Sequence, residues 1–156
     1  MDNEQKLLVF ILNSISFGIN VMDVREVLKP KKLQILPKKD DILKGIIEYK
    51  EKIVPVITLD DYLGFGERED KGRKEKRWIV VKSPEELIIE VDNVEEIISI
   101  DEREIRELPE NLARLKAIFK GVCRYKDSLI YVIDISGIVD LLKKKIEVPR
   151  LIDEKK

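Results

Sequence analysis

The apolar residues of this chain lie in many short runs that are rich in Val and Ile and are separated by polar clusters. Runs of this length and composition are typical of β-strands, because β-branched side chains fit a pleated surface. Even the longer runs, Ile53 to Leu59 and Leu129 to Ile135, are too short to cross a bilayer. The pattern predicts strands at Lys6–Asn13, Ser16–Asn20, Leu33–Leu36, Ile53–Leu59, Trp78–Val81, Leu87–Val91, Glu96–Ile100, Gly121–Tyr125 and Ser128–Ile133.

Helices are predicted to be short and to begin at Asp23, Asp101 and Ser136, each a residue type that caps helix N-termini. In the first two cases a glutamate, Glu26 or Glu104, stands three residues later, which is the spacing of a capping box. Pro30 would end the first helix after one or two turns.

The two halves of the sequence resemble each other, at matches that are 70 residues apart at first and 76 at the end. Gly18–Leu28 aligns with Ile88–Ile98, Lys44–Lys50 with Lys120–Lys126, and Ile53–Ile57 with Leu129–Ile133. The number of residues between matching segments grows along the chain, which indicates two copies of one unit with an insertion in the second copy. Gly45 and Gly121 share one position, where a bulge or a close backbone approach needs a residue without Cβ.

Residues 66–77 are all charged apart from two glycines, so we expect a solvated loop there. This loop divides a single domain, residues 1–156, into pseudo-repeat halves at about 7–65 and 78–145. We interpret the chain as two small β-barrel-like units.

Composition removes most enzyme chemistry. The chain has no His, which excludes the commonest general base and metal ligand, and its single Cys excludes paired-thiol sites. We therefore expect no catalytic residue, no metal site and no cofactor. The 30 basic residues are balanced by 31 acidic ones, which argues against a dedicated nucleic-acid surface. The charged fraction of 39% resembles a thermophile's ion-paired surface.

The sequence predicts a soluble cytoplasmic protein without membrane insertion. Its first apolar run follows acidic Asp2 and Glu4 rather than a basic segment, so we expect no secretory signal. A lone thiol, Cys123, fits the reducing cytoplasm. Cys123 aligns with Ile47 in the repeat, and we expect it to be an inert thiol inside a barrel core. Trp78 is likewise expected in the core, and Gly64-Phe-Gly66 in a turn.

One segment contains Gly45-Ile-Ile, then Ile53-Val-Pro-Val-Ile57 and Leu59. This pattern resembles the signature hairpin of CheW, the adaptor family of bacterial chemotaxis. Val91–Ile97 resembles the Val-Asp-x-Val-x-x-Val of the family, and Val132–Ser136 resembles its closing hairpin and helix cap. The resemblance runs from about Leu7 to Leu142 in the order of the family.

The resemblance implies a mainly β fold of two SH3-like five-stranded β-barrel subdomains, with short helices, a C-terminal helix and a groove between the barrels. It implies no catalytic activity. Proteins of this family bridge the cytoplasmic tips of chemoreceptors to the regulatory domain of the histidine kinase CheA. The implied partners are therefore a CheA-type regulatory domain and a chemoreceptor tip, and not a nucleic acid.

Carried over residue by residue, the resemblance implies a receptor-binding site made of Val24, Glu26, Val27, Gly45, Lys50 and Ile97. Glu26 and Lys50 stand where the family has a glutamate and an arginine close together on the receptor-facing side. The three aliphatic residues would line the groove, and Gly45 would shape the surface beside Lys50. The plainer alternatives are a helix cap for Glu26, a solvated hairpin charge for Lys50 and ordinary core packing for the aliphatic residues.

The chain departs from the family within the hairpin, where Glu48-Tyr49-Lys50-Glu51 replaces the usual Asn-Leu-Arg-Gly. Lysine at position 50 keeps the charge but loses the planar, two-pronged hydrogen bonding of arginine. Glu51 in place of glycine means that the turn either needs no positive φ there or accepts some strain. These changes leave open a different partner for the same fold.

Two other functions compete with an adaptor. The basic stretch Lys71–Arg77 could bind nucleic acid, although acidic residues share the loop and no aromatic residue interleaves with the basic ones. The pairs Asp40-Asp41 and Asp60-Asp61 could serve a hydrolase, but helix capping is the plainer role for them.

Overall fold

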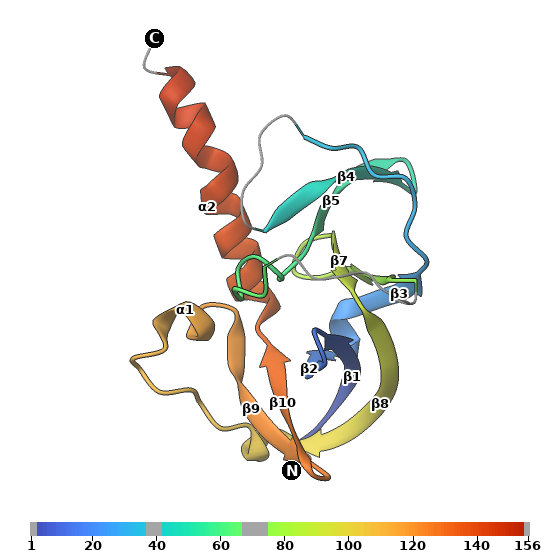
Figure 1. Ribbon diagram of the computed structural model, residues 1–156, viewed down its shortest axis with the longest axis vertical. Helices are drawn as coiled ribbons and strands as arrows, with labels where there is room; N and C mark the ends of the chain where they lie inside the picture. Colours follow the sequence, from blue (N-terminus) through green and yellow to red (C-terminus); the bar gives the residue numbers. More distant parts are fainter. Residues whose placement is uncertain (1–2, 37–41, 67–74, 155–156) are drawn as a thin grey trace.

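The computed structural model describes residues 3–36, 42–66 and 75–154 of the chain (Figure 1). Most of its elements are strands, with brief helical turns after β2 and after β8, and one longer helix closes the chain. In order, the elements are β1 (Glu4–Leu12), β2 (Ile15–Asn20), η1 (Val21–Asp23), β3 (Val24–Leu28), β4 (Leu43–Tyr49), β5 (Lys52–Ile57), β6 (Arg77–Val81), β7 (Leu87–Val91), β8 (Asn93–Asp101), η2 (Glu102–Glu104), α1 (Ala113–Lys116), β9 (Phe119–Tyr125), β10 (Ser128–Ile133) and α2 (Ile135–Glu154).

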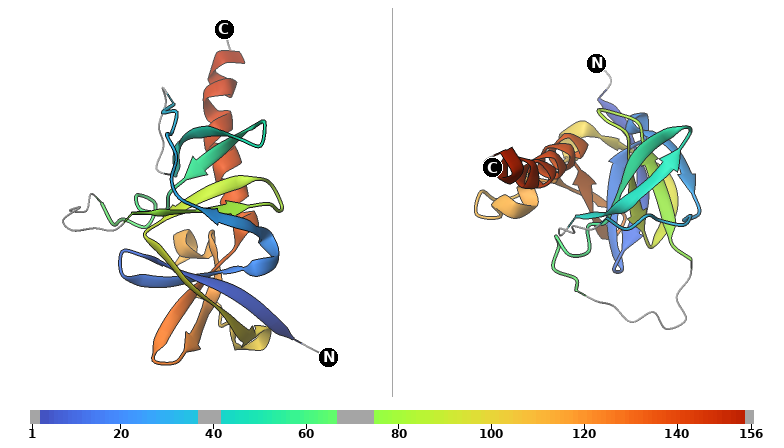
Figure 2. Two further views of the ribbon diagram at one scale, coloured as in Figure 1. Left: turned by 90° about the vertical axis from the view of Figure 1, so that its right-hand side faces the viewer. Right: turned by 90° about the horizontal axis from the view of Figure 1, so that it is seen from above.

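The strands form two five-stranded sheets, of order β8-β1-β2-β10-β9 and β3-β6-β7-β5-β4. In each sheet, the segment that follows one edge strand pairs with the opposite edge strand. Gln34 bridges Ile46 on β4, and Arg106 bridges Val122 on β9. Each sheet therefore closes on itself, and we call the two the first barrel and the second barrel. They are the lower and upper sheets of Figure 1 and of the left view of Figure 2, and they confirm the predicted fold class.

Each barrel takes strands from both halves of the sequence. The first barrel combines β1 and β2 with β8, β9 and β10, and the second combines β6 and β7 with β3, β4 and β5. The exchange has the same pattern in both barrels. Gly18 lies beside Val132 in the first barrel, and their repeat counterparts, Ile88 and Val56, lie beside each other in the second, both in parallel pairs. Neither half of the sequence contains a complete sheet, so the two halves interlock.

The buried side chains form three clusters. One fills the first barrel and includes Cys123, and one fills the second barrel and includes Trp78. The largest combines residues of both sheets with Ile138 and Leu142 of α2, so it joins the barrels to the helix. Strands such as β1 and β6 send alternate side chains into a barrel and into this shared core, which explains their nearly continuous apolar sequences. The expected core positions of Trp78 and Cys123 are confirmed.

The helix predicted to begin at Asp23 is a strand, and that prediction was wrong. Asn20 caps only a single 3-10 turn, by accepting a hydrogen bond from the Met22 N–H. The chain then enters β3, which pairs antiparallel with β6. Val24 and Leu28 pack against two of the apolar clusters, and this tertiary packing outweighs the local capping signal.

The capping box predicted at Asp101 is confirmed, but it begins one 3-10 turn rather than a longer helix. The Asp101 carboxylate accepts a hydrogen bond from the Arg103 N–H, and the Glu104 carboxylate accepts one from the Asp101 N–H. The strand predicted at Leu33–Leu36 reduces to the single bridge at Gln34.

The final helix, α2, begins one residue earlier than Ser136, and Asp134 is its cap. The Asp134 carboxylate accepts a hydrogen bond of 3.1 Å from the Gly137 N–H. The backbone of Ala117 approaches Gly137 closely, since a Cβ on Gly137 would lie 2.0 Å from the Ala117 carbonyl oxygen. In the described part of the chain, no helix is both long enough and apolar enough to span a membrane.

Gly45 and Gly121 confirm the prediction that their shared position cannot carry a Cβ. Each lies beside a register shift in its barrel. A Cβ on Gly45 would lie 2.6 Å from the Gln34 carbonyl oxygen, and one on Gly121 would lie 2.1 Å from that of Arg106. The glycines therefore admit the bridging segments that close the barrels. The strand that holds Gly45, β4, was not among the predicted strands.

Candidate functional site

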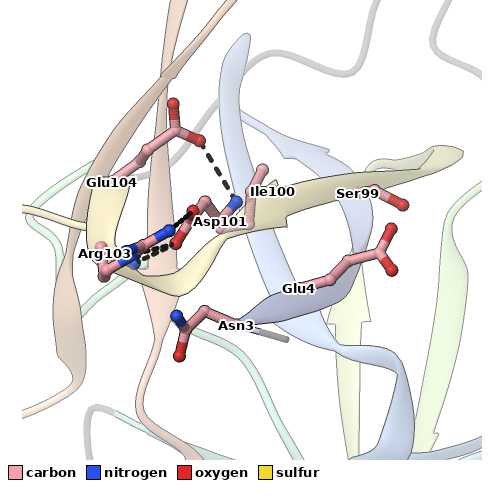
Figure 3. A pocket seen from close by; sticks show the side chains of 7 residues that line it. All are labelled: Asn3, Glu4, Ser99, Ile100, Asp101, Arg103 and Glu104. Atoms are coloured by element: carbon pink, nitrogen blue, oxygen red, sulfur yellow. Dashed lines mark hydrogen bonds and ion pairs between the residues drawn. The ribbon is translucent and has the colours of Figure 1, made fainter. Parts of the chain in front are cut away.

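A shallow polar pocket lies where the start of β1 meets the end of β8 and the η2 turn (Figure 3). Two of its acidic residues, Asp101 and Glu104, already serve the η2 turn, and Arg103 Nε and Nη2 donate to Asp101 at 3.0 and 2.7 Å. These hydrogen bonds lower the pKa of Asp101 to about 2. The lining residues are Asn3, Glu4, Ser99, Ile100, Asp101, Arg103 and Glu104, none of which belongs to the predicted site. No described His, Cys, Asp or Glu residues gather in a group of three or more that could hold a metal ion.

Three of the predicted site residues lie together on β3, an edge strand of the second barrel. Val24 is partly buried and packs against the core shared by the barrels, as its plainer alternative required. Val27 is different, because 38% of it is exposed. Glu26 is partly buried between them. The strand therefore carries one exposed aliphatic side chain and one carboxylate at consecutive positions, which point to opposite faces of the sheet.

The Glu26 carboxylate accepts a hydrogen bond from the Tyr49 hydroxyl, and this contact links edge strand β3 to edge strand β4. The Tyr49 ring is buried in the core of the second barrel, and its hydroxyl reaches Glu26 on β3. Burial, followed by the hydrogen bond to Glu26, raises the pKa of Tyr49 to about 12. Tyr49 therefore remains a hydrogen-bond donor across the physiological pH range. The capping role considered for Glu26 does not apply, since no helix begins at Asp23.

Lys50 lies in the turn between β4 and β5, next to Tyr49. Both Lys50 and Glu51 adopt positive φ, at 49° and 69°. This turn therefore keeps the left-handed backbone that glycine favours, and Glu51 accepts the strain. The Lys50 ammonium lies 5.7 Å from the centroid of the Tyr49 ring. Among the ion pairs of the described residues, none joins Lys50 to Glu26.

Ile97 lies on β8, an edge strand of the other barrel, and 58% of it is exposed. Ile97 and Val27 occupy the same position in the two repeats, so both barrels present an exposed aliphatic residue on the corresponding edge strand. Gly45 is buried on β4 and acts on the surface only through the Gln34 segment that it admits. Five of the six predicted residues therefore lie in the second barrel, on β3, on β4 or in the turn after β4. The sixth, Ile97, lies in the first barrel.

Sequence reasoning missed a second charged contact beside β3. Glu86 pairs with Arg25 at 3.2 Å and with Lys52 at 3.5 Å. These pairs hold the β4–β5 hairpin against β3 and the turn before β7. The signal for the Tyr49 contact was the departure from leucine at that position, but nothing in the sequence identified Glu26 as its partner.

The remaining candidates are used structurally or lie outside the described residues. In the basic stretch Lys71–Arg77 the first four residues are outside the described part, and Lys76 pairs with Asp92 at 2.9 Å. Nothing in these contacts favours nucleic-acid binding. Asp40-Asp41 also lies outside the described residues. Asp60-Asp61 lies in a turn that no helix follows, so its predicted capping role was wrong. The turn expected at Gly64 and Gly66 is confirmed by their positive φ.

A family model, related sequences and a solved structure all give the same family. The model of the CheW-like domain matches residues 6–143. The chain is 25% identical over 146 residues to the chemotaxis protein CheW of Helicobacter pylori, covering 92% of this chain and 86% of that protein. It is also 25% identical over 147 residues to the chemotaxis protein CheW of Bacillus subtilis, covering 93% of each.

A solved structure has the same fold. The scaffolding protein TtCheW from Thermoanaerobacter tengcongensis superposes with a TM-score of 0.74 and is 32% identical in sequence. The match covers 83% of this chain and 84% of that one. The similarity thus extends over both barrels rather than over a shared strand motif alone.

Proposed function

Because the chain belongs to the CheW-like domain family, we propose that it joins the cytoplasmic tip of a chemoreceptor to the regulatory domain of a CheA-type histidine kinase. The chain is a chemotaxis coupling adaptor and not an enzyme. In the proposal, all of its work is done by protein–protein contacts in the cytoplasm, and no cofactor takes part.

One observation carries the receptor side of this proposal: edge strand β3 presents exposed Val27 on one face and the Glu26 carboxylate, which Tyr49 orients, on the other. An apolar centre with charged groups at its rim is the usual composition of a protein-binding surface. Lys50 adds a cation on the neighbouring hairpin. The proposed receptor-binding site therefore consists of Val27, Glu26 and Lys50, with Val24 packing behind them.

Gly45 and Ile97 have different roles in the proposal. Gly45 supports the site, because it lets the Gln34 segment approach β4 and so closes the barrel that carries the hairpin. Ile97 extends the partner surface to the first barrel, as the repeat counterpart of Val27.

The test is direct binding of the whole chain to a receptor cytoplasmic fragment and to a kinase regulatory domain from the same genome. Val27→Asp should weaken receptor binding at least tenfold, because it places a charge at an apolar contact. Leu112→Asp is the matched control, since Leu112 is 40% exposed against 38% for Val27 and lies near α1. Equal weakening by both variants, or no binding by the unmodified chain, would contradict the proposal.

A further inference from the structure

We propose that the Tyr49 hydroxyl is the group that positions Glu26 for the receptor, and that Lys50 contacts the receptor separately from Glu26. This inference rests on the proposed function and assigns roles within its site. Tyr49 stands where the family usually has leucine.

The geometry makes Tyr49 a rigid support. Its ring is 6% exposed and packs with Ile47, Val54 and Trp78 inside the second barrel. A ring packed this closely into a barrel core is restricted to one orientation, so its hydroxyl is a fixed donor. That hydroxyl donates to Oε2 of Glu26. The carboxylate is thereby oriented on an edge strand, while its second oxygen forms no hydrogen bond with any described residue.

The other cations nearby do not take over the role of Tyr49. Arg25 and Lys52 both pair with Glu86, so Glu86 rather than Glu26 neutralises them. Lys50 is exposed, and its nearest recorded contact is the face of the Tyr49 ring. The surface therefore offers a partner two separate features, an oriented carboxylate oxygen and a cation on a turn. The fitting receptor tip presents an N–H donor opposite Glu26 and a carboxylate opposite Lys50.

The repeat supplies a natural comparison within the same molecule. Tyr125 and Lys126 of the first barrel correspond to Tyr49 and Lys50, and the Lys126 ammonium lies 5.3 Å from the Tyr125 ring centroid. Glu96 corresponds to Glu26, but it is exposed. No hydrogen bond among the described residues joins Tyr125 to Glu96. The second barrel alone thus combines the hairpin with an oriented carboxylate.

The test measures receptor-fragment binding by calorimetry for the full chain and four variants: Tyr49→Phe, Tyr125→Phe, Glu26→Ala and the double variant Tyr49→Phe/Glu26→Ala. Tyr49→Phe keeps the ring and removes only the donor, so it should weaken binding about fivefold. Tyr125→Phe should bind like the unmodified chain. In the Glu26→Ala background, Tyr49→Phe should have no further effect, because the group that it positions is already gone.

A spectroscopic measurement examines the contact without any partner. The tyrosinate absorbance of the unmodified chain should show one tyrosine that titrates near pH 12, and Glu26→Ala should lower that pKa. A pKa unchanged by Glu26→Ala would overturn the inference.

The binding outcomes separate the two proposals. If the unmodified chain binds and Tyr49→Phe binds equally well, the positioning role is wrong and the proposed function stands. If Tyr49→Phe weakens binding equally with and without Glu26, Tyr49 acts through the fold and the inference is again wrong. If the unmodified chain does not bind the receptor fragment, the proposed function fails and this inference fails with it.

Discussion

The Lys44 ammonium on β4 contacts both carboxylate oxygens of Glu90 on β7, at 2.8 and 2.9 Å. Glu90 also accepts a hydrogen bond of 3.2 Å from the Trp78 indole N–H. The Glu90 side chain is 9% exposed, so its charge has little contact with water. A buried carboxylate is tolerated in this way only while its partners are present.

Removal of Lys44 should therefore destabilise the chain more than loss of the whole pair. We expect Lys44→Ala to lower the free energy of unfolding by about 2 kcal/mol, because it leaves the Glu90 charge without its cation. The double variant Lys44→Met/Glu90→Gln should recover most of that loss, because the neutral amide oxygen can still accept the hydrogen bond from the Trp78 indole N–H. Chemical denaturation of the two variants decides the matter, and a double variant less stable than Lys44→Ala would contradict the prediction.

Gly121 should tolerate substitution far less than Gly64. A Cβ on Gly121 would lie 2.1 Å from the Arg106 carbonyl oxygen, whereas nothing lies within 4 Å of a Cβ on Gly64. Gly64→Ala meets only the strain of its positive φ, which is about 1 kcal/mol, while Gly121→Ala must also displace the segment that closes the first barrel. We expect a loss of about 3 kcal/mol or more for Gly121→Ala. Equal melting temperatures for the two variants would show that the Arg106 segment yields freely.

The Tyr49 contact should make stability depend on pH in the alkaline range. The pKa of Tyr49 is raised from its ordinary value of 10 to about 12 in the folded chain. The folded state therefore holds the proton more tightly than the unfolded state. The contribution of the protonated Tyr49 to the free energy of unfolding is complete below about pH 10, and it is lost as the pH rises through 12. Unfolding free energies of the unmodified chain and Tyr49→Phe, measured between pH 9 and 12, should converge at the high end of that range. A constant difference would contradict this prediction.

A cut between the two sequence halves should not separate them. Each barrel needs strands from both halves, so each fragment completes the sheet of the other. With a specific protease site inserted within residues 67–74, the cleaved chain should elute from gel filtration as one species of unchanged size. Separation of the fragments without denaturant would show that the exchanged strands do not hold the molecule together.

Much of this fold can be read from the sequence, because strands buried on two faces leave nearly unbroken apolar runs such as Trp78–Val81. The aspartate–glutamate spacing at Asp23 is misleading for the opposite reason. It is a local signal, and the pairing of β3 with β6, residues far apart in the chain, outweighs it. Strand β4 was missed because Lys44, Gly45 and Glu48 interrupt its apolar pattern.

The exchange of strands could not be predicted from the repeat. Two copies of one sequence pattern have the same spacing whether each copy folds on itself or lends strands to the other. The contact of Tyr49 with Glu26 could not be predicted either, because it depends on two edge strands that meet only when the second barrel closes. The buried position of Cys123 was predictable, since it required only the register of one strand against its repeat counterpart Ile47.

The central claim, that this chain couples a receptor to a kinase, is tested most directly by a three-component assembly. A receptor cytoplasmic fragment and a CheA-type kinase from the same genome are mixed with and without the chain, and the kinase bound to immobilised receptor is measured. We expect the chain to raise receptor-bound kinase severalfold, and Val27→Asp to abolish the increase while Leu112→Asp preserves it. An equal amount of receptor-bound kinase with and without the unmodified chain would contradict the claim.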